Sequence, residues 1–594
     1  MADDIKDRLF GDKKMSLWAI AVRTFAYLKK ETGSFLLAIF FLVLAVGIDT
    51  ILPLVMKEFT NDLDLSVSGV EYRVLLLLGL GYFALIVINQ VFLYAESMLL
   101  QRAGQKIIYR LRNDVFEHVE NMSIAQLNMM PVGSLVTRVA FYTANMSDLF
   151  TNTLVSILRN ILTIVAVSVI MFVLSPSLAG IMMAFLAVVF VISFFFSRYV
   201  KRIFRLERSK QSEFNTYLNE TLSGMKIVQL FVQENRKKKQ FDEKNAELRR
   251  LRMKVISAFA VYRPLISFLY YLALAATFFF AFRFELSSGD VVAFYLLLSN
   301  FFSPIERLAD SLNNLQRAHA ASEKLYSLLD VKPDVVDSPN AIAIEQFKGE
   351  IEFRNVWFAY EGEEWILKDV NFHILPKQTV AFVGATGSGK TTILSLIVRN
   401  FVPQKGDIFI DGINIKDIQV KSLRKAVGQM LQDVFLFSGS IKDNITLYDS
   451  DAYTDEEVMK VCDYVNASAF INALDGGLQS QVIEKGENFS SGQRQLLSFA
   501  RTVLSNPQIL ILDEATANID TETESLIQDS LNKMKSIGTM LVVAHRLSTI
   551  QHSDNIIVLQ QGTIVEQGSH QELLHKKGLY FKLYQLQFEQ GNES

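Results

Sequence analysis

The feature that most constrains this chain is a series of long apolar stretches confined to its N-terminal half. Most are close to the roughly 20 residues that a helix needs to cross about 30 Å of hydrocarbon. Six such stretches are present, at about residues 35–56, 74–100, 153–174, 178–199, 256–282 and 291–302. We therefore expect six transmembrane helices, the last of which continues as a polar helix.

The segments between these spans differ in length and in charge. The three short joints, residues 57–73, 175–177 and 283–290, hold only Lys57, Arg73 and Arg283 as basic residues, whereas residues 198–263 hold seventeen Lys or Arg against seven Asp or Glu. Because basic loops stay on the cytoplasmic side, the long loops at 101–152 and 200–255 and both termini are predicted to be cytoplasmic. Both long loops read as helical, so they extend tens of Å beyond the bilayer.

Residues 17–30 precede the first span and alternate apolar with basic side chains at helical spacing. This pattern favours an amphipathic helix on the inner membrane surface over a simple extension of the first span. No short apolar core with a small-residue cleavage site opens the chain, so we do not expect a cleavable signal peptide.

Overall composition excludes several classes of protein. Lys plus Arg is 59 and Asp plus Glu is 62, so the net charge of −3 provides no general attraction for nucleic acid. The single cysteine, Cys462, excludes an intrachain disulfide and a cysteine-cluster metal site. We expect Cys462 to be a small apolar residue of a helix.

The C-terminal part differs from the N-terminal half in its pattern of apolar and polar residues. We expect a transmembrane domain over residues 1–325, a polar linker over 326–348 that contains prolines, and a second domain over 349–594. In the second domain the strand-like runs IEFRNVWF, TVAFVGA, ILILD and TMLVVAH occur, and a helical segment follows each of the last three. This alternation predicts an α/β fold with a largely parallel sheet.

A glycine-rich motif follows the strand-like run TVAFV and precedes a helix. It consists of Gly384, Ala385, Thr386, Gly387, Ser388, Gly389, Lys390 and Thr391, followed by Thr392. This matches the P-loop pattern in its strand–loop–helix setting, where backbone N–H groups surround a phosphate. Lys390 would then face the β- and γ-phosphates, and the Thr391 hydroxyl would bind Mg²⁺.

A second motif is the apolar run at 509–512 that ends in two acidic residues. Asp513 is placed to hold the Mg²⁺ shell, and Glu514 is placed to polarise an attacking water. Apolar strands often end in acidic residues, so this motif alone does not indicate a metal site. It does so here because it follows a P-loop in the sequence.

Together these motifs resemble the ATP-binding cassette (ABC) family, whose signature motif is represented here by Phe489, Ser490, Ser491, Gly492 and Gln493. In the family's usual order, Tyr360 resembles the adenine-stacking aromatic, Gln432 the Q-loop glutamine and Glu484 the X-loop acid. Residues 517–520 resemble the D-loop, and His545 the switch histidine. The resemblance implies ATP and Mg²⁺ as cofactors, with Thr391, Gln432 and Asp513 near the metal. It also implies Glu514 as catalytic base, assisted by His545, Lys390 and Gln432.

The resemblance extends to nearly the whole chain. Six spans fused ahead of one cassette resemble a half-transporter of the type IV ABC exporter fold, an all-α transmembrane domain followed by an α/β P-loop domain. The segments at about 129–133 and 222–231 would be the coupling helices. Because the signature of one cassette faces the P-loop of another in this family, a second chain is implied as partner, with ATP-driven alternating access in a bacterial cytoplasmic membrane.

The third position departs from the family's usual Leu-Ser-Gly-Gly-Gln signature, because Ser491 replaces the first glycine. A Cβ at this position would crowd the phosphate and narrow backbone freedom, so the site that receives this signature should hydrolyse ATP poorly. This chain combines a complete P-loop and a complete acidic motif (the Walker A and Walker B motifs) with a deviant signature. In this it resembles one chain of the heterodimeric bacterial multidrug exporters of the LmrCD and EfrCD kind. The partner is then expected to carry an intact signature and a degenerate catalytic acid.

Polar residues inside the spans are candidates for contact with a transported molecule, since they are costly in hydrocarbon. Such residues are Asp49, Asn89, Gln90, Arg159, Asn160 and Asn300. We single out Asp49, Asn89, Gln90 and Asn300 as substrate candidates, and Asp49 is the best candidate for attracting a cationic amphiphile. Phenylalanines of the last two spans could stack on such a molecule, although most are expected to face lipid or pack between helices. Export of drugs is the leading hypothesis; a lipid flippase or peptide exporter, and an ATP-gated channel or drug-sensing regulator, remain alternatives.

Overall fold

The computed structural model describes residues 15–65, 72–430, 434–513, 521–543 and 550–592. These residues divide into two compact units. The first comprises the chain up to Glu120 and Met130–Val331, and the second comprises Asn121–Met129 and the chain from Lys332 onward. Each unit is described separately below.

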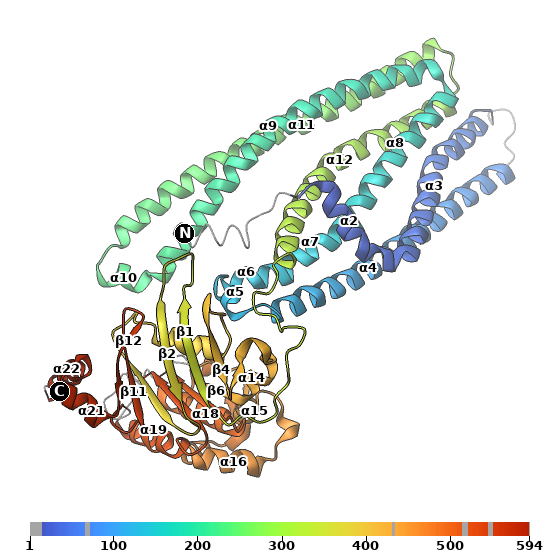
Figure 1. Cartoon of the computed structure of the whole chain (residues 1–594). Coiled ribbons are helices and arrows are strands. Elements are labelled where there is room, and N and C mark those ends of the chain that lie inside the picture. The colour runs from blue at the N-terminus through green and yellow to red at the C-terminus, as the bar shows by residue number, and fades with distance from the viewer. Residues whose placement is uncertain (1–14, 66–71, 431–433, 514–520, 544–549, 593–594) are drawn as a thin grey trace. The chain divides into compact units, whose positions relative to one another are not determined.

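The first unit is entirely helical (Figure 1). Its helices are α2 (Leu17–Leu28), α3 (Thr32–Leu65), α4 (Tyr72–Glu120), α6 (Val132–Thr137), α7 (Thr143–Asp148), α8 (Leu154–Leu174), α9 (Pro176–Ser223), α10 (Met225–Leu230), α11 (Glu234–Arg283) and α12 (Ser288–Leu329). Six helical segments among the described residues are long and apolar enough to cross a membrane: Val22–Leu63, Arg73–Glu120, Val132–Leu174, Pro176–Ser223, Glu234–Arg283 and Ser288–Ile305. The six predicted spans are therefore confirmed.

The short joints are formed by local capping. Ser175 has an extended backbone, its side chain accepts a hydrogen bond from the Leu178 N–H, and Pro176 follows as the first residue of α9. Ser287 and Asp290 form a reciprocal capping box that starts α12. Asp290 also forms an ion pair with Lys57 of α3 at 2.9 Å, which ties two joints on the same side together.

The first predicted coupling segment, at about residues 129–133, directly follows a short helix. The short helix α5 lies at Ile124–Asn128 and groups with the second unit, whereas Met129 and the residues just after it form the turn that leads into α6. The capping box of Ser123 and Gln126 starts α5. The second coupling segment does contain a helix, α10, between the long helices α9 and α11.

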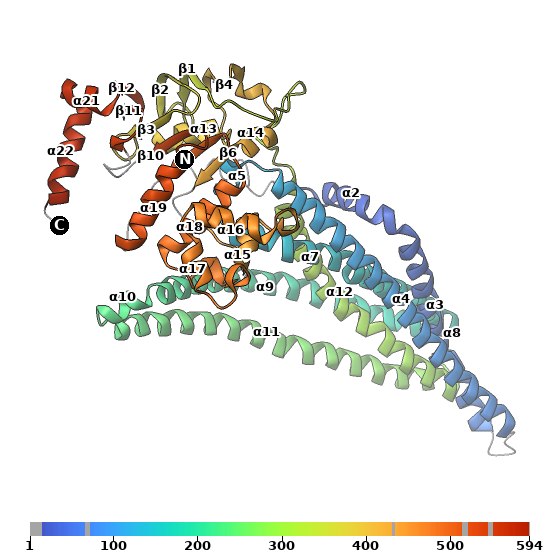
Figure 2. The same ribbon diagram turned by 90° about the horizontal axis from the view of Figure 1, so that it is seen from below.

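Helices α9 and α11 lie side by side along their length, with α10 at their turn (Figures 1 and 2). The predicted helical character of this long loop is confirmed, since both helices run well beyond the apolar windows of the sequence. In contrast, the path from α6 to α8 includes two π-helical turns, Arg138–Tyr142 and Leu149–Thr153. Turns of this kind are rare and often mark functional positions.

The second unit contains two main sheets (Figure 1). An antiparallel sheet has the order β2-β1-β4-β5, from β1 (Ile351–Phe358), β2 (Leu367–Ile374), β4 (Lys405–Ile410) and β5 (Ile413–Asn414). A six-stranded sheet has the order β12-β11-β3-β10-β9-β6, from β3 (Thr379–Val383), β6 (Val427–Met430), β9 (Ile509–Asp513), β10 (Thr539–Val543), β11 (Asn555–Gln560) and β12 (Thr563–Gly568). Strands β7 (Gly439–Ser440) and β8 (Gln481–Val482) form a short pair.

All neighbours in the six-stranded sheet pair in parallel except β11 with β12. The predicted parallel sheet is thus confirmed, although the sequence did not reveal that IEFRNVWF belongs to a separate antiparallel sheet. Every residue of β3 and β10 is buried, because helices such as α18 pack against one face and the antiparallel sheet with α13 packs against the other. Besides α5, the α-helices among the described residues of this unit are α13 (Lys390–Ile397), α14 (Val420–Ala426), α15 (Ile441–Thr446), α16 (Asp455–Tyr464), α17 (Ser468–Asn472), α18 (Ser491–Leu504), α19 (Thr521–Met534), α21 (His570–Lys576) and α22 (Leu579–Asn592).

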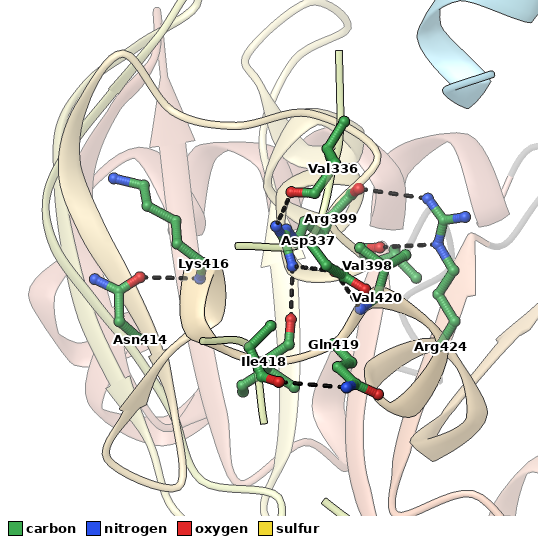
Figure 3. A network of polar contacts seen from close by, with 11 residues as sticks. Val336, Asp337, Val398, Arg399, Asn414, Lys416, Ile418, Gln419, Val420 and Arg424 are labelled. Carbon is green, nitrogen blue, oxygen red and sulfur yellow. Dashed lines mark hydrogen bonds and ion pairs between the residues drawn. The ribbon is translucent and has the colours of Figure 1, made fainter. Parts of the chain in front are cut away.

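The segment after α12 is fastened to the second unit by a buried arginine (Figure 3). The Arg399 guanidinium donates to the carbonyl oxygens of Ile418 at 2.6 Å and Val336 at 3.0 Å, and to Asp337 Oδ1 at 3.2 Å. The same Asp337 oxygen accepts the Val420 N–H at 2.9 Å. Val336 and Asp337 of the predicted linker are therefore held against the rest of the second unit by hydrogen bonds, although they lie outside regular secondary structure.

Candidate functional site

The glycine-rich loop lies between the buried strand β3 and helix α13. Gly387 has φ of +81° and Gly389 has φ of +103°, and both values are in the region that favours glycine. A Cβ added to Gly389 would lie 2.6 Å from Leu367 Cδ2. The loop therefore depends on glycine for its backbone path, and it leads directly into the start of helix α13, where backbone N–H groups can bind an anion.

Lys390 is held over this loop by the loop's own backbone. Its side chain is 7% exposed, and Nζ donates to the carbonyl oxygens of Gly384 at 2.8 Å and Ala385 at 3.1 Å. Burial lowers the pKa of Lys390, and the attraction of Asp513 acts in the opposite direction. Ser388 Oγ is buried and has no hydrogen-bond partner among the described residues, so the loop offers a further polar group to a ligand.

The oxygen groups suited to Mg²⁺ lie beside this lysine. Thr391 is exposed in the first turn of α13, and Asp513 is the last residue of β9, where it pairs with Val543 in the neighbouring strand. Hydroxyl and carboxylate oxygens are the donors that Mg²⁺ prefers. The chemistry of this donor set therefore fits the metal that accompanies a nucleotide.

Tyr360 presents an aromatic ring at the edge of the same region. Its hydroxyl is 3.0 Å from Thr392 Oγ1, and its ring makes edge contacts with Phe358 and Phe401 at centroid distances of 5.0 and 5.1 Å. The side chain nevertheless remains 49% exposed. A ring held in this way can stack on a flat base without rearrangement.

Several predicted residues cannot be placed. Gln432, Glu514, His545 and the predicted D-loop at 517–520 lie outside the described residues. Glu484 is described, and it is exposed at the start of a short helical turn, Glu484–Gly486.

The signature residues form the start of helix α18. Phe489 is buried, and the Ser490 side chain accepts the Gln493 N–H at 3.2 Å while Gln493 Oε1 accepts the Ser490 N–H at 3.0 Å. Ser491 is the first helical residue and does not have a positive φ, and Gly492 follows it in a buried position. The helical backbone at position 491 does not require glycine, so the expectation that a side chain restricts the backbone there is wrong. Only the steric bulk of the Ser491 side chain remains as a reason to expect slow ATP hydrolysis.

Comparisons with known proteins agree with this geometry. The family model described as the ABC transporter transmembrane region matches residues 35–305, and the one described as ABC transporter matches residues 367–517. The uncharacterized ABC transporter ATP-binding protein YknV of Bacillus subtilis is 36% identical over 99% of this chain and 96% of its own length. The chain belongs to the ABC transporter family.

Other similarities place this ABC transporter among exporters. The Bacillus subtilis protein named "Probable multidrug resistance ABC transporter ATP-binding/permease protein YheH" is 35% identical, covering 87% of this chain and 77% of the relative. The ATP-dependent lipid A-core flippase of Syntrophus aciditrophicus is 30% identical, covering 98% and 96%. A solved bacterial Atm1-family ABC exporter with ATP bound has 26% identity and a TM-score of 0.78, covering 95% of this chain and 99% of the other.

The chain is thus a type IV ABC exporter half-transporter. It is a multi-pass membrane protein with a cytoplasmic nucleotide-binding domain and an ATPase coupled to transport. Exporters of this fold act as dimers.

Three of the four substrate candidates in the exporter's spans come together. Asn89 Nδ2 donates to Asp49 Oδ1 at 2.6 Å, and Asn300 Nδ2 approaches the Asp49 carbonyl oxygen at 3.5 Å. Asn89 is buried, and its Oδ1 has no partner among the described residues. Gln90 does not join them, because it faces the exposed side of α4.

The aromatic residues of the last two spans divide into two groups. Phe294, Phe301 and Phe302 are buried between helices, whereas Phe278, Phe279 and Tyr295 are exposed. The expectation that most of these rings pack helices or face outward is consistent with their burial.

Arg159 and Asn160, two further polar residues predicted inside a span, belong to a second polar cluster whose acidic member, Glu96, was not predicted. Glu96 of α4 is 2% exposed and forms an ion pair with Arg159 of α8. The pair borders a cavity of about 370 Å³ whose walls also include Asn160, Arg307 and the π-helical residue Thr151. A glutamate near the end of an apolar run was the available signal, but the sequence alone did not show that it faces Arg159.

Proposed function

We propose that this chain is one half of a heterodimeric exporter that uses ATP to move lipophilic and cationic amphiphiles out of the cell. The observation that carries the ATP-driven part is the cradle around Gly387 and Gly389, with the Lys390 ammonium buried over it. Backbone amides and a single cation at a helix start are the groups that bind a polyphosphate.

In this proposal each part of the site has one task. Tyr360 stacks on adenine, Lys390 attracts the β- and γ-phosphates, and Thr391, Gln432 and Asp513 hold Mg²⁺, which neutralises charge on the phosphates when bound. Glu514 accepts a proton from the attacking water, and His545 stabilises the charge that develops. The signature residues Phe489, Ser490, Ser491, Gly492 and Gln493 serve the nucleotide bound to the partner chain.

The heterodimeric state is proposed from Ser491. A homodimer would place this side chain in both ATP sites, although the P-loop and Asp513 are complete in each. A partner with an intact signature and a degenerate catalytic acid would leave one competent site instead. The signature motif of each chain would then complete the ATP site on the other chain.

The decisive experiment reconstitutes the chain with its partner in liposomes and measures drug-stimulated ATPase activity together with dye efflux. We expect both activities, and both should disappear in the Glu514→Gln variant. Nucleotide binding without turnover would instead indicate a channel or sensor. ATPase activity stimulated by peptides, with no efflux of dyes, would indicate a peptide exporter.

Asp49 is proposed as the group that attracts cationic cargo. Asn89 occupies one of its carboxylate oxygens through a 2.6 Å hydrogen bond, and the side chain is only partly buried, so the carboxylate can still meet a second partner. Asp49→Asn should lower transport of cationic dyes while sparing neutral ones. Equal transport of both by the variant would show that Asp49 has a structural role only.

Lipid flipping is the second candidate function, and the cavity beside Glu96 and Arg159 favours it. Arg307 lines that cavity, and no ion pair to it occurs among the described residues. A free cation near the cytoplasmic end of the spans suits an anionic lipid headgroup. Translocation of a fluorescent anionic lipid by the reconstituted pair, without efflux of cationic dyes, would favour this candidate.

A further inference from the structure

A large groove lies between helices α9 and α11, away from both sites described above. Its volume is about 1040 Å³. From α9 it is lined by Ile192, Phe196 and Tyr199, and from α11 by ten residues between Ala246 and Leu265. One end of the groove is apolar and aromatic, and the other end is cationic.

The aromatic end is built from rings of both helices. Phe196 and Tyr262 stack in parallel with centroids 3.8 Å apart and an interplanar angle of 6°. The Tyr262 hydroxyl is 2.8 Å from Ser193 Oγ, so the polar end of the tyrosine is satisfied within the protein. Val261 and Leu265 continue the apolar wall toward the centre of the span.

The cationic end carries Arg249, Arg250 and Lys254, all exposed on α11. No ion pair to any of the three occurs among the described residues, and no acidic residue lines the groove. Neighbouring cations of the same helix are paired, since Lys244 contacts Glu213 at 2.8 Å and Arg252 contacts Glu207 at 3.4 Å. The three groove cations are therefore available to an external anion.

The groove runs from the inner boundary of the hydrocarbon toward the cytoplasm. Helix α11 ends on the outer side at Arg283, and about 20 residues of helix cross the hydrocarbon, so the inner boundary lies near Tyr262. Lys254 is then about 12 Å further along the helix at 1.5 Å per residue, Arg250 and Arg249 are about 18 and 20 Å further, and long basic side chains can reach back toward the boundary. The aromatic pair thus lies at the boundary, and the cations lie on its cytoplasmic side.

We propose that this groove binds the phosphate headgroup of an anionic phospholipid from the cytoplasmic leaflet. Arg249, Arg250 and Lys254 would hold the phosphate, and the first carbons of the acyl chains would lie along Phe196, Tyr262 and Val261. Basic pockets between transmembrane helices on the cytoplasmic side bind anionic headgroups by this combination of charge and apolar contact. A soluble phosphate would use the cations but not the aromatic wall.

The test measures retention of phosphatidylglycerol against phosphatidylcholine on the purified full-length chain by native mass spectrometry. The triple variant Arg249→Gln, Arg250→Gln, Lys254→Gln should lose affinity for phosphatidylglycerol by about fivefold per cation, on the order of 100-fold in total, since each surface cation contributes about 1 kcal/mol. Phosphatidylcholine retention should not change. A charge-conserving triple variant, Arg249→Lys, Arg250→Lys, Lys254→Arg, should keep the preference and shows that the helix pair remains folded.

The matched control removes three other exposed cations of the same helix, Arg236, Lys238 and Lys239, by glutamine substitution. Equal loss of phosphatidylglycerol in this control would overturn the proposal, because general surface charge would then explain binding. Equal retention of both lipids by the unmodified chain would overturn it as well. Displacement of the lipid by millimolar glycerol phosphate would show that the groove recognises a soluble phosphate instead.

Discussion

At the scale of single residues, the nucleotide loop shows why glycine occurs where it does. Gly387 and Gly389 both have positive φ, but the space around them differs. Apart from its chain neighbours, no atom of the described residues lies within 4 Å of a Cβ added at Gly387, whereas Leu367 lies 2.6 Å from one added at Gly389. Substitution at the first position therefore costs backbone strain alone, and substitution at the second adds a steric clash.

This difference gives a graded prediction. Gly387→Ala should destabilise the nucleotide-binding unit by about 1–2 kcal/mol, the usual cost of a left-handed backbone for a residue with a Cβ. Gly389→Ala should destabilise it further and weaken ATP binding more strongly, because Leu367 must move. Thermal unfolding and nucleotide titration of the two variants would check this order, and equal effects would contradict it.

The predicted catalytic base supplies a second test at this scale. Glu514→Gln should lower steady-state ATPase activity by about 10²-fold or more, since a positioned base contributes about 10²–10⁴-fold to a rate. ATP affinity should stay near that of the unmodified chain, because the amide keeps the shape of the carboxylate. Unchanged turnover would remove Glu514 from this role, and lost binding would show a structural role.

At the scale of elements, the Arg399 clamp fixes the segment that leaves α12. The guanidinium donates to two carbonyl oxygens and to Asp337, although the Asp337 side chain is much more exposed than Arg399. Arg399→Met should therefore destabilise the nucleotide-binding unit by about 2–3 kcal/mol, because hydrogen bonds from a charged group are lost and carbonyl groups stay buried.

Asp337→Asn is the matched control for this clamp. Its amide oxygen can still accept from Arg399 and from the Val420 N–H, so we expect a loss of less than about 1 kcal/mol. Denaturant unfolding followed by fluorescence would compare the two variants. Similar losses in both would show that the exposed charge pair, and not the buried carbonyl contacts, provides the stability.

The elements that sequence predicted well are those that local patterns define. Apolar length defined the spans, and the order strand, glycine loop, helix defined the nucleotide cradle. The bounds of α5 were not predicted, because a capping box at Ser123 and Gln126 sets its start. The Glu96–Arg159 pair was missed because it joins residues 63 positions apart, and no local pattern shows which faces of two helices meet.

At the scale of the whole molecule, the remaining question is what completes each ATP site. Ser491 has an ordinary helical backbone and is only partly buried. In the proposed assembly its side chain would therefore act by steric bulk toward a nucleotide on the partner chain. In a homodimer this bulk would affect both sites. In a heterodimer it would face a site that already lacks its catalytic acid, where it has little to inhibit.

Ser491→Gly therefore separates the two assemblies. If the chain purified alone is a homodimer, the substitution should raise its ATPase activity several-fold, because both sites gain a normal signature. For the proposed heterodimer, the unmodified chain alone should have little cooperative ATPase activity, and addition of the partner should restore it. Ser491→Gly in that pair should change turnover by less than about twofold, since the affected site has no base. Strong cooperative turnover by the chain alone, further raised by Ser491→Gly, would contradict the heterodimer and assign both sites to copies of this chain.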